Sequence, residues 1–319
     1  MPNDTRRLRI LTWHVHGNYL WYLTQVPHDF YLVTDPERST HHTGRSGTLP
    51  WGDNVHEAPL EMLRDMTFDV VLYQSRAEYD KARMGLLSEA QRRLPSVYLE
   101  HDPPLDSPTD QRHWADDGRS TIVHVTGFNA LMWAHLESPV EVIDHGIRLL
   151  SPARYTGRQA RGVVVVNNIA TRGRRLGPDV FQQLREQVPL TLVGMGSAEL
   201  GGHGEVENSK LPAFIADYRF FFNPIRYTSL GLSVLEAMMV GLPIIGLATT
   251  EMSTVIVNGV NGWLDTRPER LVPVMRQLIA DPELARRWGE GARRTAEERF
   301  GIDRFIADWQ RVFARVAGA

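Results

Sequence analysis

The sequence contains no cysteine, and only two of its 35 basic residues, Lys81 and Lys210, are lysines. The absence of cysteine excludes a disulfide framework, a thiolate zinc site and a thiol nucleophile. The shortage of lysine restricts Schiff-base or pyridoxal chemistry to two positions. The other 33 basic residues are arginines.

A basic excess and a long apolar run are also missing. The 35 basic residues face 38 acidic ones, for a formal net charge of -3, whereas general nucleic-acid binders normally show a basic excess. We therefore expect no nucleic-acid partner. No segment approaches the about 18 consecutive apolar residues of a membrane span, and the apolar stretch at residues 8–15 lacks the cleavage site of a signal peptide. We expect a cytoplasmic protein, with peripheral contact at the inner membrane face left open.

What is present is an ordinary globular composition, with 42% hydrophobic and 23% charged residues. Short apolar runs alternate with segments of helical spacing, such as residues 179–187 and 229–240, as is typical of parallel sheets with crossover helices. We therefore predict an α/β fold. The expected strands cover residues 8–15, 30–34, 68–73, 96–99, 121–125, 141–143, 162–166, 190–193, 218–222 and 243–247.

The chain length predicts two domains at roughly 100–200 residues each. The segment SPARYTG at residues 151–157 is polar and carries proline and glycine, and the strand pattern restarts after it. We therefore predict domains at 1–150 and 151–301, both Rossmann-like, followed by a C-terminal helix at 302–319. The apolar stripe of that helix needs a partner surface, which we expect on the first domain; its members are Phe305, Trp309, Val312, Phe313 and Val316.

Three further local patterns give expectations. Residues 41–59 hold few apolar side chains and several Gly and Pro, so they are interpreted as a long loop. TRPE at 266–269 has the spacing of a capping box, and Asp281-Pro282 is expected to begin the next helix.

The most informative segment covers residues 220–245, with the pattern strand, turn, helix, glycine stop, strand. Thr228 or Ser229 can cap the helix, and Gly231 near its start allows an anion to approach free backbone N–H groups. Glu236 lies on a mainly apolar helical face, where an unpaired carboxylate is costly. It either pairs with an arginine or holds two hydroxyls of a ligand, such as those of a ribose.

This segment resembles the donor-binding signature of glycosyltransferase family 4, whose members have the GT-B fold of two Rossmann-like domains facing across a cleft. The family carries two glutamates here; the second corresponds to Glu236 in LEAM (235–238), and the first falls at Thr228. The resemblance continues through GLP (241–243), VNGVNGWL (257–264), DPELA (281–285) and ERF (298–300). It covers nearly all of the second half, whereas the first half matches only in architecture and a few loops.

The resemblance implies a nucleotide-diphosphate sugar on the C-terminal half, with UDP or GDP as the expected nucleotide. Glu236 would hold the ribose, and arginines next to Gly173, where the family has a lysine, would hold the diphosphate; a solvated basic turn is the alternative. The donor-binding residues expected are Gly17, Asn168, Arg172, Arg174, Arg175, Gly194, Ser229, Leu230, Gly231 and Glu236.

For catalysis, the resemblance points to His101 at a strand end facing the sugar, Asp102 as its orienting or acceptor-contacting neighbour, and Thr228. An exposed loop histidine is the alternative for His101. Thr228 can donate a hydrogen bond but supplies no negative charge, which leaves a non-catalytic sugar-nucleotide binder open.

The remaining histidines carry weaker signals. His14 and His16 point to one side of a strand, but no acidic cluster completes a metal site, so we expect neither a metal nor another cofactor. His124 and His145 are interpreted as structural or cleft-lining.

The resemblance thus implies metal-independent, retaining transfer of a sugar to an acceptor hydroxyl of a glycan, a lipid-linked compound or a small molecule. The leaving phosphate would take the acceptor's proton. A GT-B epimerase is the enzymatic alternative, and the scarcity of lysine disfavours a pyridoxal-dependent phosphorylase. The donor base and sugar, the acceptor and the oligomeric state stay undetermined.

Overall fold

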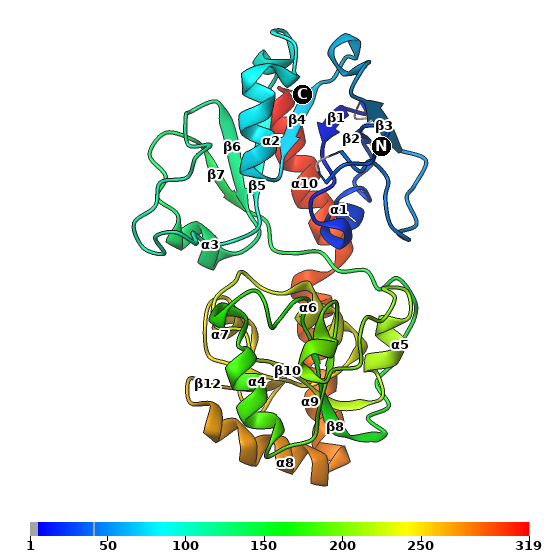
Figure 1. Cartoon of the computed structure of the whole chain (residues 1–319), viewed down its shortest axis with the longest axis vertical. Helices are drawn as coiled ribbons and strands as arrows, with labels where there is room; N and C mark the ends of the chain where they lie inside the picture. Colours follow the sequence, from blue (N-terminus) through cyan, green and yellow to red (C-terminus); the bar gives the residue numbers. More distant parts are fainter. Residues whose placement is uncertain (1–5, 41, 319) are drawn as a thin grey trace. The chain divides into compact units, whose positions relative to one another are not determined.

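The computed structural model describes residues 6–40 and 42–318, and it forms two compact units (Figure 1). The N-terminal unit contains the residues up to Gly146 and those from Ile302 onward. The C-terminal unit runs from Ile147 to Gly301.

Seven strands described in the N-terminal unit form one parallel sheet in the order β3-β2-β1-β4-β5-β6-β7. They are β1 (Arg9–Thr12), β2 (Asp29–Thr34), β3 (Val55–Pro59), β4 (Val70–Tyr73), β5 (Ser96–Glu100), β6 (Ser120–His124) and β7 (Val140–Val142). The helices are α1 (Gly17–Leu23), α2 (Arg76–Lys81), α3 (Gly127–Met132) and α10 (Ile302–Ala317), with short helical turns at Leu63–Asp65, Ala82–Leu86 and Gln91–Arg93.

The described part of the C-terminal unit contains a second parallel sheet in the order β12-β11-β10-β8-β9. Its strands are β8 (Gln159–Val165), β9 (Leu190–Val193), β10 (Tyr218–Asn223), β11 (Ile244–Leu247) and β12 (Gly262–Asp265). The helices are α4 (Pro178–Arg185), α5 (Leu211–Ile215), α6 (Leu232–Val240), α7 (Met252–Val255), α8 (Leu271–Ala280) and α9 (Pro282–Phe300), with 3-10 turns at Arg174–Leu176, Ser197–Leu200 and Pro268–Arg270. The predicted α/β class with parallel sheets is therefore confirmed.

The last helix, α10, packs against α1 and β4 of the N-terminal unit (Figure 1). The ring centroids of Phe305 and Tyr19 lie 5.6 Å apart, and those of Phe313 and Phe30 lie 6.3 Å apart. Gly146 passes so close to α10 that a Cβ there would lie 2.3 Å from Phe305. The four stripe residues from Phe305 to Phe313 are buried, whereas Val316 is half-buried.

Two edge strands are absent from the expected set. The interpretation of residues 41–59 as one loop is wrong for β3, which pairs in parallel with β2 from Phe30↔Val55 to Thr34↔Pro59; His41 lies outside the described residues. The other missed strand is β12. An edge strand can carry polar side chains and proline, so its sequence lacks the apolar run that identifies a central strand.

The helix-start predictions had mixed outcomes. Asp281 accepts a hydrogen bond from the backbone N–H of Leu284 at 2.9 Å, which confirms it as the cap of α9. The capping box at Thr266 is wrong, because Arg267 occupies the N-cap position and makes no side-chain cap. The chain enters a 3-10 turn there instead.

Candidate functional site

The C-terminal unit has a topological switch point beside β8. Strand β9 lies on one side of β8 and β10 on the other, so successive crossovers leave β8 in opposite directions. In open α/β sheets, ligands bind beyond the carboxyl ends of the strands at such a point. The three segments expected to bind the donor follow β8, β9 and β10, and they therefore meet at this edge of the sheet.

The loops after β8 and β9 are hydrogen-bonded to each other. The backbone N–H of Asn168 donates to the carbonyl of Met195 at 2.7 Å, and the N–H of Met195 donates to Oδ1 of Asn167 at 2.9 Å. Gly194 has a φ of 130°, and a Cβ there would lie 2.7 Å from both Asn167 Oδ1 and Val166 O. This close approach requires glycine at 194. The loop with Asn168 and the loop with Gly194 are therefore fixed against each other.

Helix α6 begins at Leu232, with Gly231 as an N-cap that offers no side chain. The predicted cap at Thr228 or Ser229 is wrong, because both residues lie in the irregular segment before the helix, where the carbonyl of Ser229 accepts from Thr250 Oγ1 at 3.3 Å. Within the described residues, the backbone N–H groups of Leu232 and Ser233 meet no acceptor. Such N–H groups, together with the helix dipole, favour an anion.

The start of α6 is attached to the end of β8. The Ser233 hydroxyl donates to the carbonyl of Val165 at 3.3 Å. One turn further along α6, Glu236 is only 9% exposed, and Thr228 is half-buried in the preceding segment. The structure thus places Gly231 and Glu236 on the element that starts at the switch point.

The three predicted arginines differ in their contacts. Arg174 forms an ion pair with Asp179 at 3.1 Å. Arg226 also pairs with Asp179, at 2.6 Å, and its hydrogen bond lowers the pKa of Asp179 well below the usual value. The sequence analysis missed Arg226, although this residue lies in the signature segment. In the described part of the chain, neither Arg172 nor Arg175 has an acidic partner, so their guanidinium groups are available for a ligand.

The loop that carries Arg172, Arg174 and Arg175 is also held beside the segment that leads into α6. The carbonyl of Arg175 accepts hydrogen bonds from the backbone N–H groups of Arg226, at 2.8 Å, and Tyr227, at 3.3 Å. The predicted arginines and the entry to α6 therefore form one continuous backbone structure.

The N-terminal unit has its own switch point between β1 and β4, and His101 lies just after the neighbouring strand β5. The amide nitrogen of Gln74 donates to the carbonyl of Trp13 at 2.9 Å and to Thr12 Oγ1 at 3.1 Å. Its oxygen therefore faces Nε2 of His101, 3.2 Å away. Because a carbonyl such as that of Trp13 can only accept, the amide orientation is determined, and Nε2 of His101 must carry the proton.

His101 is electrically neutral at physiological pH in this environment. Burial, followed by the charges of His16 and His145, lowers its pKa well below 6.5. The ring of His16 lies 4.1 Å from that of His101, and Tyr19 meets the His101 ring edge-on at 4.8 Å. Among the described residues Nδ1 of His101 has no hydrogen-bond partner, so its lone pair is available.

Glu100 is a candidate residue that the sequence analysis missed. It is 6% exposed at the end of β5, and burial raises its pKa to about 8. Its two oxygens accept from Nε2 of His113 at 3.0 Å and from the backbone N–H of Asp102 at 2.9 Å. The signal that could have revealed it is an acidic residue directly after the apolar run Val97, Tyr98 and Leu99.

A cavity of about 330 Å³ opens beside His101. Its wall includes the aromatic rings of Tyr98, Trp114 and Trp133, while its polar lining includes Gln74, Glu100, His101 and Asp102. The indole N–H of Trp133 donates to the carbonyl of Asp102 at 2.9 Å, which holds the loop against the wall. Apolar ring faces combined with a few hydrogen-bonding groups suit a polar organic ligand such as a sugar.

The other predicted residues of this unit lie nearby. Gly17 begins α1, and a Cβ there would lie 3.1 Å from Nε2 of His14. Nδ1 of His14 contacts the carbonyl of Gly44 at 2.8 Å. Described His, Asp and Glu residues do not gather in a group of three or more that could hold a metal. His124 is fully buried and hydrogen-bonded to His135 at 2.9 Å, which is a structural position.

Comparison with known proteins finds similarity over part of the chain. Residues 182–295 match the model of "Glycosyl transferases group 1". The uncharacterized glycosyltransferase MJ1069 of Methanocaldococcus jannaschii is 25% identical over 155 residues, which cover 43% of this chain and 40% of that protein. The chain therefore spans less than half the length of this curated relative.

Solved structures share the fold. A sucrose-phosphate synthase from Thermosynechococcus elongatus has a TM-score of 0.71 at 15% identity, covering 97% of this chain and 99% of its own. HepE from Anabaena, solved with UDP and glucose, has a TM-score of 0.71 at 12% identity, covering 97% of this chain and 100% of its own.

In the residues that the structure describes, no helix is both long and apolar enough to cross a membrane.

The predicted GT-B fold is confirmed by the structural matches, and the assignment to family 4 stays a prediction. The two parallel-sheet units give the chain the GT-B fold of the matched structures, and residues 182–295 of its C-terminal unit are similar to group 1 glycosyl transferases.

Proposed function

We propose that the chain transfers a glycosyl group from a nucleoside-diphosphate sugar to an acceptor hydroxyl. The observation that carries this proposal is the anion site at the switch point of the C-terminal unit. There, the start of α6 and the loop with Arg172 and Arg175 belong to one connected backbone structure. Over residues 6–40 and 42–318, the N–H groups of that helix start meet no acceptor and the two guanidinium groups meet no acidic partner. The presence of UDP in the HepE structure supports UDP as the first nucleotide to test.

The C-terminal unit would hold the donor. Guanidinium groups fork onto phosphate oxygens, and N–H groups at a helix start stabilise the charge that develops on the departing diphosphate. Asn168 and Gly194 shape the adjoining loops, and Glu236 would accept hydrogen bonds from ribose hydroxyls. Ser229, Leu230 and Gly231 would bring the backbone of α6 close to the phosphates.

The N-terminal unit would bind the acceptor in the cavity beside His101. Neutral His101 can accept a hydrogen bond at Nδ1, Asp102 can accept from an acceptor hydroxyl, and Glu100, largely protonated at pH 7, can donate. Gly17 would leave space for the donor phosphates, as the resemblance implies. In the transfer, the bond from the anomeric carbon to the diphosphate breaks, the bond to the acceptor oxygen forms, and the acceptor's proton passes to a diphosphate oxygen, with retention of configuration.

This scheme needs no metal, because guanidinium and N–H groups meet the diphosphate charge. We expect a hexosyl donor and an acceptor that is a glycan, a lipid-linked compound or a small molecule. The absence of cysteine favours the cytoplasm, with optional contact at the membrane surface.

The test is a thermal-shift panel of UDP, GDP, ADP, dTDP and CMP with and without magnesium. A ligand that binds only the folded state stabilises it by about 2.7 kcal/mol at a hundredfold excess over Kd. We expect one diphosphate, UDP or GDP, to raise the midpoint with little dependence on magnesium. A flat response in folded protein would refute the proposal.

Thr228 favours one second candidate, a sugar-nucleotide binder without turnover. The position lacks the carboxylate that the resemblance associates with the reacting centre. Donor binding without release of free nucleotide, over a broad acceptor panel, would support this candidate over the transferase.

A further inference from the structure

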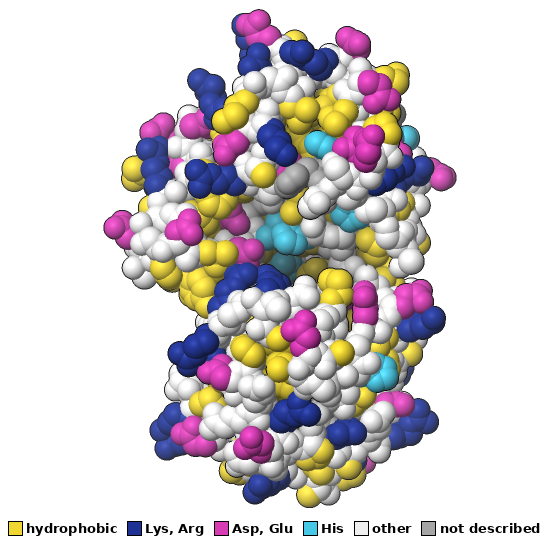
Figure 2. Space-filling view, in the orientation of Figure 1, with side chains coloured by type: hydrophobic (Ala, Val, Ile, Leu, Met, Phe, Trp, Pro, Cys, Tyr) yellow, Lys and Arg dark blue, Asp and Glu magenta, His cyan; other side chains and the backbone are white. Residues whose placement is uncertain are grey.

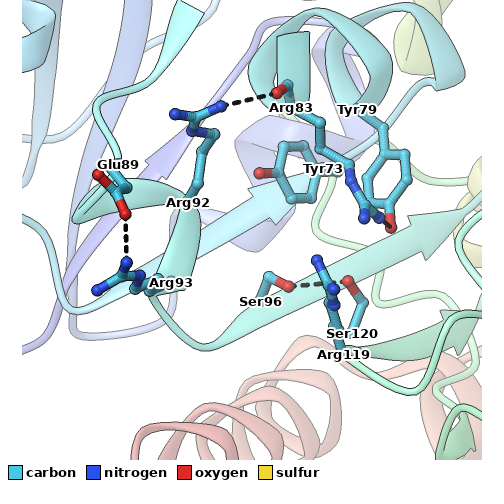
Figure 3. Close-up of a pocket in the computed structure, with 9 residues that line it drawn as sticks. All are labelled: Tyr73, Tyr79, Arg83, Glu89, Arg92, Arg93, Ser96, Arg119 and Ser120. Atoms are coloured by element: carbon cyan, nitrogen blue, oxygen red, sulfur yellow. Dashed lines mark hydrogen bonds and ion pairs between the residues drawn. The ribbon is translucent and has the colours of Figure 1, made fainter. Parts of the chain in front are cut away.

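A second cavity lies in the N-terminal unit, at the amino ends of β5 and β6 (Figure 3). Its volume is about 310 Å³. Ser96 begins β5 and Glu100 ends it, so at about 3.3 Å per residue the two Cα atoms are about 13 Å apart. The cavity is therefore separate from the one beside His101.

Arginines dominate the charged lining of this cavity, which we call the arginine cavity. Arg83, Arg92, Arg93 and Arg119 line it, and Glu89 is the one acid among its nine lining residues. Figure 2 shows several basic side chains on the surface of the N-terminal unit around α2. The cavity therefore presents a positive excess.

Two of the four guanidinium groups are already neutralised. Arg83 pairs with Asp117, and Arg93 pairs with Glu89, whose side chain is 73% exposed. Within the described ranges, the one acceptor of the Arg92 guanidinium is the carbonyl of Arg83, at 3.1 Å. Arg119 has no acidic partner among the described residues; its backbone N–H, not its guanidinium, contacts Asp117. Arg92 and Arg119 thus bring two uncompensated charges to the cavity.

The floor of the arginine cavity adds a neutral donor that is nearly buried. Tyr73 is 5% exposed, and no described residue accepts a hydrogen bond from its hydroxyl. The ring is held by stacking on Trp13 at 5.6 Å and by an edge contact with Tyr79 at 5.0 Å. Figure 3 shows the hydroxyl pointing into the space between Arg92 and Ser96. The hydroxyl of Tyr73 is thus a donor that faces the cavity on a ring fixed by its neighbours.

Two serines add another donor. Oγ of Ser96 lies 2.8 Å from Oγ of Ser120. Only one of the two hydroxyl hydrogens can lie between these oxygens, so the other is free to donate elsewhere. The inner surface therefore offers hydrogen-bond donors from Tyr73 and the serine pair, below the free charges of Arg92 and Arg119.

We propose that the arginine cavity is a binding site for a phosphate-bearing ligand. A phosphate group combines several acceptor oxygens with the negative charge that forked guanidinium groups recognise. The volume is at the lower end of small-molecule sites, which fits a phosphomonoester or diphosphate of small size. The site is independent of the donor site, because it lies in the other unit and uses different residues.

The test titrates pyrophosphate into the full chain by calorimetry in the presence of saturating UDP, which occupies the donor site if the proposed function is right. We expect saturable binding that weakens at least roughly tenfold in Arg92→Ala/Arg119→Ala and severalfold in Tyr73→Phe, which keeps the ring and removes the hydroxyl. Arg64→Ala/Arg287→Ala removes two exposed arginines elsewhere and serves as the charge-matched control. Circular dichroism confirms that each variant is folded.

A parallel arm measures binding to vesicles of phosphatidylglycerol in phosphatidylcholine. Variant-sensitive binding of pyrophosphate assigns a soluble ligand, whereas variant-sensitive binding of vesicles alone assigns the phosphate of a lipid headgroup. Equal losses in the control, or no effect of the cavity variants on either probe, overturn the proposal. The readout is separable from the proposed function, because the cavity variants should leave the affinity for UDP unchanged.

Discussion

The side-chain oxygen of Gln74 accepts a hydrogen bond from Nε2 of His101 at 3.2 Å, so the nitrogen that His101 presents to a ligand is Nδ1. The residues are 27 positions apart and meet only because β4 and β5 are neighbours in the sheet. Gln74 is therefore a positioning residue for His101.

The first prediction concerns this pair. Gln74→Leu should allow the other tautomer of His101, in which Nδ1 no longer accepts a hydrogen bond, and lower kcat by up to roughly tenfold, the effect of losing one hydrogen bond of about 1.4 kcal/mol. His101→Ala should lower kcat further, while both variants should leave UDP affinity nearly unchanged. Steady-state kinetics and calorimetry check this, and an equal loss of UDP affinity would contradict the assigned roles.

The second prediction is that Glu236→Gln weakens donor binding without unfolding the protein. The substitution keeps the volume and removes a charged acceptor, which typically costs roughly 1.5–3 kcal/mol. Calorimetry with the preferred nucleotide measures the effect. Glu186→Gln, an exposed glutamate of the same unit, is the control and should have normal affinity. Unchanged affinity in folded Glu236→Gln would refute the ribose assignment.

The third prediction separates the three arginines. Arg172 and Arg175 have no acidic partner among the described residues. Replacing the one that holds the diphosphate by lysine should weaken donor binding roughly tenfold, because the forked geometry is lost. Arg174→Lys should have a smaller effect, because Arg174 pairs with Asp179. Normal donor affinity and turnover in alanine variants at all three positions would place the phosphate site elsewhere.

The fourth prediction concerns alkaline pH. The pKa of Glu100 is raised to about 8 in the folded state, above the 4.5 of an unperturbed glutamate. Between pH 4.5 and 8 the folded state keeps a proton on Glu100 that the unfolded state has released. The free energy of unfolding therefore falls as pH rises through this window, by up to about 1.4 kcal/mol per pH unit, and the contribution of Glu100 is lost once pH passes 8. Glu100→Gln should flatten this decline in unfolding experiments between pH 6 and 8. An identical slope would contradict the raised pKa.

The fifth prediction concerns acid. Burial lowers the pKa of His113 to about 3 and that of His124 to about 2. Below pH 6.5 these two histidines bind protons in the unfolded state but stay neutral in the folded state. The free energy of unfolding should therefore fall as pH drops below 6.5, by up to about 1.4 kcal/mol per pH unit for each ring. His124→Gln should lose less stability than the wild type between pH 6.5 and 4.5. Parallel declines would show that His124 does not resist protonation.

Local pattern was sufficient for most of the secondary structure. Each expected strand overlaps an observed one, and 190–193 matches β9 at both ends, because buried central strands must be apolar along their length. The two missed strands, β3 and β12, lie at sheet edges, where one side needs no apolar cover.

The donor segment shows where local reasoning stops. The turn and helix at 220–245 follow from periodicity and glycine placement, and the observed α6 ends before Gly241, which has a φ of 104°. The cap was mistaken because the backbone of Ser229 is held by Thr250, 21 positions away. A cap prediction from neighbouring residues has no access to such a contact.

By itself the sequence determined the α/β class, the order of its elements and the segment that carries the glycosyltransferase resemblance, because these depend on residue type and spacing within short windows. Only the tertiary structure decided the chemical state of the candidate groups. Which arginine is free depends on Asp179, which nitrogen of His101 is protonated depends on Gln74, and whether Glu100 keeps its proton depends on burial at the end of β5. Charge, tautomer and pKa are set by neighbours within a few ångströms, and folding chooses those neighbours from distant parts of the chain.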